Sequence, residues 1–230
     1  MSDESIFREV DEEIRHEQFK KLWDKYGIYV ISACVGVVVA VGGIKGWQAY
    51  QVSVAESAGA QYIKAIEHLS KSESEEAQKV FSALASGGPS GYAALARFQT
   101  AAALIKSQDK AGAVKAFDAL AADTGVDPML RDLARVKAGL IAVDSETVDA
   151  VEARVSALNT RDNPWRNAAR EIIALAAYRA GDVVKADRLY TEIIGDLSAP
   201  KGLRERAQIM LTLLQPQIPR EPAQTRTDRE

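Results

Sequence analysis

The fold of this chain is decided by residues 165–194, which read WRNAAREIIALAAYRAGDVVKADRLYTEII. Apolar residues recur at helical spacing on both sides of Gly181-Asp182, a pair typical of a turn between two helices. The segment therefore predicts two antiparallel helices, with Ala186 and Tyr190 one turn apart in the second. A small alanine lets two helices approach closely, and a large aromatic ring fills the space toward the next pair.

The same pattern repeats along the chain. The segment EAQKVFSALA begins at Glu76, and GAVKAFDALA begins at Gly112, 36 residues later. A further 73 residues on, its alanine and aromatic positions recur as Ala186 and Tyr190. The unit between them, DAVEARVSALNT, is degenerate, with Ala150 near the expected place. One pair of helices cannot bury its apolar faces alone, so we expect stacked pairs that form an α-solenoid.

Residues 48–214 alternate helical patterns with short breaks that carry Gly, Pro, Asp and Asn. No segment alternates with a period of two, so the sequence predicts an all-α protein without a sheet. The second helix of each pair starts near a carboxylate, as expected for a cap or a dipole interaction; these are Glu73, Asp109, Glu146 and Asp182. We expect helices at 48–70, 74–86, 91–107, 110–122, 127–143, 146–158, 164–180, 183–195 and 201–214.

An uncharged run, YGIYVISACVGVVVAVGGI, extends from Tyr26 to Ile44. A helix rises about 1.5 Å per residue, so about 20 residues cross a hydrocarbon core of about 30 Å. Aromatic residues lie near both ends of the run, where their rings favour the membrane interface. We expect a single uncleaved transmembrane helix at 26–47. The alternatives are a cleaved signal peptide, a lipoprotein signal ending at Cys34, or a buried core helix.

Basic residues flank this span unequally: five precede it, whereas after Lys45 the next one is Lys64. Because the flank richer in lysine and arginine stays in the cytoplasm, we expect a cytoplasmic N-terminus and a C-terminal domain across the membrane. Within the span, small residues recur on one face, where another helix could approach closely. This candidate helix-contact face consists of Ser32, Gly36, Ala40 and Gly43.

A leader and a tail complete the chain. Residues 1–25 predict an amphipathic helix near the cytoplasmic membrane surface or against a partner, or else a solvated helix that leads into the span. Residues 215–230 combine prolines with polar residues and are expected to be disordered. The expected organisation is therefore a cytoplasmic leader (1–25), a transmembrane helix (26–47), a repeat domain (48–214) and a disordered tail (215–230).

Residues that carry enzyme chemistry are sparse. The net charge of -3 shows no nucleic-acid footprint, and the single cysteine excludes an intramolecular disulfide. His16 and His68 fall on opposite sides of the expected span, and motifs for serine nucleophiles, phosphate loops and metalloproteases are missing. We expect a protein that is not an enzyme, with no catalytic residue, cofactor or metal.

A binding surface is expected on the concave face formed by the first helix of each pair. Arginines on these helices could meet acidic groups or C-terminal carboxylates of a protein partner. The alternative is an ordinary solvated surface. The candidates are Arg97, Arg135, Arg166, Arg170 and Arg179.

Residues 165–194 resemble a tetratricopeptide repeat, because Gly181-Asp182, Ala186 and Tyr190 sit where that motif has glycine-aspartate, a small residue and an aromatic. Residues 91–117 form a second, looser unit. The units exceed the usual length of about 34 residues, and the consensus glycine of the first helix is mostly absent. The resemblance therefore implies a tetratricopeptide-like solenoid.

Residues 5–214 also resemble the ancillary SecYEG translocon subunit family of Gram-negative bacteria. The shared features are KLWDKYG before the span, Gly42-Gly43 and Gly46-Trp47 after it, and PWRNAAREIIALAAYRAGD with APKGLRERAQ later. The resemblance implies a single-pass inner-membrane protein whose periplasmic domain associates with the Sec translocon and aids handover of exported proteins to a periplasmic chaperone. The alternatives are a scaffold for another envelope or cell-division assembly, or a regulatory subunit acting through the leader.

Overall fold

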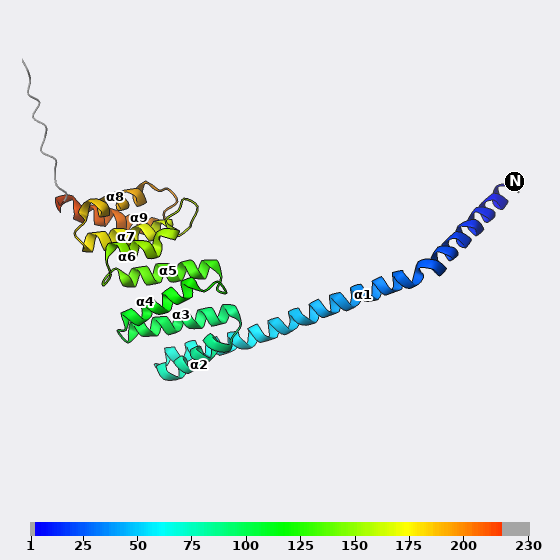
Figure 1. Cartoon of the computed structure of the whole chain (residues 1–230), viewed down its shortest axis with the longest axis horizontal. Coiled ribbons are helices and arrows are strands. Elements are labelled where there is room, and N and C mark those ends of the chain that lie inside the picture. Colours follow the sequence, from blue (N-terminus) through cyan, green and yellow to red (C-terminus); the bar gives the residue numbers. More distant parts are fainter. Residues whose placement is uncertain (1–2, 218–230) are drawn as a thin grey trace, which may run out of the picture. The chain divides into compact units, whose positions relative to one another are not determined.

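A computed structural model describes the backbone of residues 3–217 and the side chains of residue 20 and residues 22–217. The chain is helical throughout this range and contains no strand there, so the predicted all-α fold class is confirmed. Figure 1 shows the helices in chain order. They are α1 (Asp3–Ser70), α2 (Ser74–Gly87), α3 (Ser90–Lys106), α4 (Lys110–Ala122), α5 (Pro128–Ala142), α6 (Val148–Val155), η1 (Ser156–Leu158), α7 (Arg166–Arg179), α8 (Val183–Gly195), α9 (Lys201–Leu214) and η2 (Gln215–Gln217).

Helix α1 contains three segments that were expected separately: the leader, the membrane span and the first repeat helix at 48–70. They join because no proline interrupts the helix between them. The chain forms two compact units, Met1–Ser57 and Ala58–Glu230, whose boundary falls inside α1. The domain boundaries expected at 25/26, 47/48 and 214/215 stay predictions. Helix η2 occupies the start of the segment expected to be disordered, and residues 218–230 lie outside the part that the structure describes.

The apolar part of α1 is the only helix in the described residues that is long and apolar enough to cross a membrane. Its large side chains are exposed, including Val38 at 71% and Tyr29 at 70%. A core helix would bury such side chains, because exposed apolar surface is unfavourable in water. The segment is therefore exposed within its own unit, and it is a candidate membrane span or signal anchor.

Two of the four expected carboxylates cap second helices. Asp109 accepts a hydrogen bond from the backbone N–H of Gly112 at 2.8 Å at the start of α4. Asp182 accepts one from the N–H of Lys185 at 3.0 Å at the start of α8. Each bond satisfies one of the backbone donors that a helix leaves free in its first turn. These local bonds explain why both helices begin where the sequence predicted.

The other two carboxylates act differently. Glu73 precedes α2 but makes no cap bond with its side chain, which instead lies 2.5 Å from Nδ1 of His68. The expectation that Glu146 starts the next second helix is wrong. Thr147 caps that helix, α6, which begins at Val148. The side chain of Glu146 is bound by Arg154 and is not available to cap a helix.

The repeat register is confirmed by burial. The alanine of each predicted pair is 0% exposed and the aromatic residue is at most 2% exposed; these residues are Ala77 with Phe81, Ala113 with Phe117, and Ala186 with Tyr190. In the degenerate unit the expectation for Ala150 is wrong, because Ala150 is exposed and Val151 is buried. Helix α6 directs Val151 and Val155 inward, which is the i,i+4 spacing of one helix face.

Each first helix contributes a small buried residue twelve positions before the buried residue of the second helix. Three of these are alanines, Ala65, Ala101 and Ala174, and the fourth is Gly139. The glycine is required by close packing: a Cβ atom there would lie 2.8 Å from Cγ1 of Val155 and 3.2 Å from Cγ2 of Ile172. The unit that carries Val151 in place of alanine in its second helix thus has glycine, Gly139, in place of alanine in its first helix.

Candidate functional site

The predicted arginines of α3 and α5 lie at joints between neighbouring helices. Arg97 donates to the carboxylate of Asp123, beyond the end of α4, at 2.6 Å. Arg135 donates to Asp132 at 2.7 Å and to the backbone oxygen of Ala121 at 3.4 Å. The side chains of Arg97 and Arg135 are 30% and 28% exposed. Both guanidinium groups are therefore engaged within the solenoid.

Arg166 and Arg170 are brought together at the carboxylate of Asp196, in the turn between α8 and α9. The Nε atom of Arg166 donates to Asp196 at 3.0 Å, and Nη1 of Arg170 lies 3.5 Å from it. Asn167 donates at 3.0 Å, and the hydroxyl of Ser198 donates at 2.7 Å. These bonds lower the pKa of Asp196, with the Ser198 hydroxyl as the largest cause, then Asn167 and Arg166. The cluster fixes the start of α7 to the turn after α8.

Arg179 lies apart from the other arginines, at the end of α7. It donates to the backbone oxygen of Asp144 at 2.8 Å and to that of Glu146, in the loop between α5 and α6. Both oxygens belong to the preceding helical unit. Arg97, Arg135, Arg166, Arg170 and Arg179 therefore join helices of the solenoid, and their binding of partner carboxylates stays a prediction.

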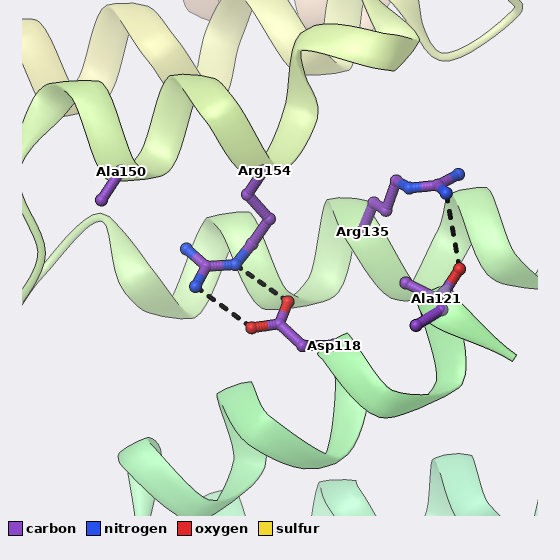
Figure 2. A pocket seen from close by; sticks show the side chains of 6 residues that line it. Asp118, Ala121, Arg135, Ala150 and Arg154 are labelled. Atoms are coloured by element: carbon purple, nitrogen blue, oxygen red, sulfur yellow. Dashed lines mark hydrogen bonds and ion pairs between the residues drawn. The ribbon is translucent and has the colours of Figure 1, made fainter.

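A further arginine, Arg154 of α6, was missed by the sequence analysis. It donates to both carboxylate oxygens of Asp118, at 2.9 and 3.1 Å, and to both of Glu146, at 2.6 and 3.1 Å. Hydrogen bonds to Glu146 and then Asp118 raise its pKa above the ordinary value. Figure 2 shows Arg154 and Arg135 at the same pocket, of about 360 Å³, between α4, α5 and α6.

The charges of this first pocket are already paired. Arg154 is only 16% exposed and binds two carboxylates, while Arg135 binds Asp132. A partly buried arginine that already has two carboxylate partners gains little from an outside anion, because binding it would break an existing ion pair. The ion pairs at this pocket therefore join the second helical unit (α3 and α4) to the third (α5 and α6). In the sequence, Arg154 could have been noticed as an arginine on the second helix of a unit, whereas the binding surface was expected on the first helices.

A second pocket, of about 400 Å³, opens on the first helices of the last units. Its wall is apolar apart from one ion pair, in which Arg206 donates to both oxygens of Glu171 at 2.7 and 2.9 Å. It is lined by Leu140 of α5, Glu171 and Leu175 of α7, Tyr190 of α8, and Arg206, Ile209 and Met210 of α9. None of the predicted arginines lines this pocket.

Tyr190 lines this second pocket and carries a buried polar atom. The residue is 0% exposed, and its hydroxyl oxygen has no hydrogen-bond partner among the described residues. Burial raises the pKa of Tyr190, and the nearby carboxylate of Glu171 adds to the shift. The hydroxyl therefore stays protonated and can both donate and accept a hydrogen bond. From the sequence, Tyr190 was predicted only as a packing residue.

The candidate helix-contact face of the span lies on the exposed surface of α1. All four of its residues, Ser32, Gly36, Ala40 and Gly43, are exposed. A Cβ atom added at Gly36 or Gly43 would meet nothing within 4 Å. Cys34 is also exposed and free. Whether another helix packs on this face stays a prediction.

Metal ligands are sparse in the part of the chain that the structure describes. No group of three or more His, Cys, Asp or Glu side chains there could hold a metal ion. His68 belongs to the end of α1, where its ring contacts Glu73, and the position of the His16 side chain lies outside the described residues.

Comparison with known proteins gives one family. A family model described as a tetratricopeptide repeat-like domain matches residues 20–215. No curated protein and no solved structure matches the chain. The matched range runs from the residues before the apolar segment of α1 to the start of η2, so it covers the candidate span and the whole solenoid.

Proposed function

The chain belongs to the tetratricopeptide repeat-like domain family, and from this premise we propose that it is a membrane-anchored scaffold of the Sec translocon. A domain of this kind is a protein-interaction scaffold, because stacked helix pairs present an extended surface for partners. The observation that carries the proposal is the matched range itself, residues 20–215. It joins the apolar segment and the solenoid in one family unit.

The proposed anchor is the apolar part of α1. In water its exposed valine, isoleucine and aromatic side chains would be unfavourable, whereas in a bilayer they would face lipid. The excess of lysine and arginine before the span supports a cytoplasmic N-terminus. In this orientation the solenoid lies in the periplasm and the protein is a single-pass inner-membrane protein.

The proposed role is handover of exported proteins from the translocon to a periplasmic chaperone. A scaffold at the membrane raises the effective concentration of its partners, because binding of the second becomes intramolecular. The repeat surface and the span offer separate contacts for the two partners. In this role the protein is not an enzyme and needs no cofactor.

Two experiments test the proposal. A reporter that is active only outside the cytoplasm is fused after Leu214 or after Asp3, and we expect activity only for the first fusion. The full chain, with a photoreactive residue at exposed Val184 or Ile209, is then crosslinked in intact membranes, and the products are identified by mass spectrometry.

We expect translocon subunits and a periplasmic chaperone among the crosslinked products. Activity of the reporter after Asp3 would contradict the orientation and with it the periplasmic role. Crosslinks confined to a cell-division or other envelope assembly would contradict the translocon association, while the protein-interaction function would stand.

A further inference from the structure

The exposed apolar surface of α1 continues beyond residue 47, where the membrane span was expected to end. No charged residue occurs between Lys45 and Glu56. Four large side chains in this stretch are 37–64% exposed in the first compact unit, Met1–Ser57; these are Trp47, Tyr50, Val52 and Val54. So much apolar surface over about two helical turns is unfavourable in water, which indicates that something covers it.

These four side chains do not lie on one face of the helix. At about 100° per residue, Trp47 and Val54 point in nearly the same direction, and Val52 lies about 140° away from Trp47. Tyr50 lies beside Trp47, and the centroids of the two rings are 6.0 Å apart. A partner helix packs against one face only, whereas lipid surrounds a helix on all sides. The distribution therefore favours lipid over one docked helix.

The polar residues of the stretch also suit the membrane interface. Gln48, Gln51 and Ser53 are uncharged and can form hydrogen bonds with lipid headgroups. Trp47 and Tyr50 favour the same region, because each ring has an apolar body and one polar group. These residue types together are expected where acyl chains give way to headgroups.

The length of the exposed apolar part of α1 matches a whole bilayer. This part extends from Leu22 to Val54, or about 48 Å at about 1.5 Å per residue. At a tilt of about 20°, the average for membrane helices, it covers about 45 Å along the bilayer normal. The hydrocarbon core is about 30 Å thick, and the bilayer with both headgroup regions is about 40–45 Å thick. Lys45 then lies near the edge of the core, where its long stem lets the ammonium group reach the headgroups.

We propose that residues 47–54 lie in the interface of the leaflet on the C-terminal side of the span and contact phospholipid on all faces. The inference rests on the proposed function, since it requires α1 to be the membrane anchor. Glu56 then marks the return of the chain to water, and the second compact unit begins two residues later, at Ala58. The scaffold therefore begins at the lipid surface, with no linker between the lipid-embedded residues and the second unit.

Spin labels on the full chain test this depth. The chain is placed in nanodiscs of phosphatidylcholine and phosphatidylglycerol. Because Cys34 is the chain's single cysteine, Cys34→Ala gives a background for one nitroxide-labelled cysteine at a time. The labelled variants are Tyr50→Cys, Val52→Cys and Val54→Cys, with Val38→Cys in the middle of the span as the lipid control and Ile63→Cys, further along α1, as the water control.

Power-saturation EPR compares collisions of each label with O₂ and with a water-soluble nickel chelate. We expect the ratio of oxygen to nickel collisions at positions 50, 52 and 54 to be at least about 3-fold higher than at position 63, because apolar O₂ concentrates in lipid and the polar chelate does not. The ratio should be highest at position 38. Position 52 should behave like position 54, although the two side chains point in different directions.

A ratio at position 52 or 54 no higher than at position 63 would overturn the inference, because lipid contact would then end before these residues. Protection of positions 50 and 54 from both reagents, with position 52 exposed, would also overturn it and would indicate a second copy of the chain on that face. In both cases a lipid-like value at position 38 leaves the proposed membrane anchor standing. A water-like value at position 38 would instead contradict the anchor, and the proposed function would fail with it.

Discussion

Gly139→Ala tests the closest approach between helices in the solenoid. Gly139 lies inside α5, where alanine is a much better helix former than glycine, so propensity alone predicts a gain of about 1 kcal/mol. The structure predicts the opposite sign. A Cβ atom would lie 2.8 Å from Cγ1 of Val155 and 3.2 Å from Cγ2 of Ile172.

The magnitude follows from these two distances. Carbon atoms are most stable about 3.5–4.0 Å apart, so both contacts are too short. An extra carbon in a well-packed core costs about 1–3 kcal/mol, because neighbouring helices or rotamers must shift. Since the gain in propensity offsets about 1 kcal/mol of this, we expect the free energy of unfolding to fall by up to about 2 kcal/mol. For a domain of this size, that is a drop of about 4–8 °C in melting temperature.

The assay is urea unfolding of the full chain in lipid nanodiscs, followed by loss of helical circular dichroism. The matched control is Gly91→Ala in α3, where an added Cβ atom meets nothing within 4 Å. We expect the control to be as stable as the unchanged chain or slightly more stable. Amide hydrogen exchange in α5 and α7 should rise for Gly139→Ala only.

A double-mutant cycle identifies the contact responsible. Val155→Ala removes the methyl group at 2.8 Å, so Gly139→Ala should be nearly neutral in that background. We expect a coupling free energy of at least about 1 kcal/mol between the two sites. If Gly139→Ala stabilises the chain as the control does, or if the two effects simply add, the close approach of α5 and α6 inferred here is wrong.

Four further predictions concern the packing, a turn, an ion pair and the span. Ala186→Leu should overpack α8 against its neighbours and lower the free energy of unfolding by about 1–3 kcal/mol in urea, and an unchanged midpoint would contradict the repeat register. Gln108→Gly should raise the free energy of unfolding by up to about 1 kcal/mol in the same assay. Gln108 has a φ of 66°, which favours glycine, and the equivalent position of the last unit is a glycine, Gly181, with a φ of 82°. Folding lowers the pKa of Asp196 from 3.8, so the stabilisation by this carboxylate is present above about pH 4 and is lost as the pH falls below that value. Asp196→Asn should therefore flatten the acid dependence of the melting temperature, and an unchanged pH profile would refute this. Gly36→Leu with Ala40→Leu should still insert but should co-purify with less of its membrane partner, whereas unchanged recovery would mean that the span only tethers.

Local patterns predicted the helices well because each depends on neighbouring residues. Helical periodicity, turn residues and capping carboxylates placed α2 to α5 and α7 to α9 within two residues of their observed ends. The helix expected at 48–70 is instead the end of the longer α1, and the helix expected at 146–158 is α6 followed by η1. The start of α6 was missed because Glu146, a plausible cap, is bound by Arg154 from later in the chain. The degenerate unit was shifted by one residue because the register of α6 depends on its packing against α5 and α7.

The candidate surfaces were harder to predict. The arginines were assigned to first helices correctly, but their partners lie in other helices, as with Arg97 and Asp123 or Arg170 and Asp196. No pattern within one helix reveals such a pairing, because the two residues are far apart in sequence. The sequence therefore does not distinguish a free basic surface from a set of ion pairs within the solenoid.

The amino-acid sequence was enough to predict the all-α class, the register of three of the four repeat units and the apolar segment long enough to span a membrane. These follow from periodicity, residue size and hydrophobicity, which act over a few residues or a single helix. The stacking of the helices shows that Gly139 is required at a helix contact and that the predicted arginines join helices. It also leaves the hydroxyl of Tyr190 buried without a partner among the described residues. Each of these depends on which side chains of neighbouring helices meet, and that is set by the stacking of whole helices.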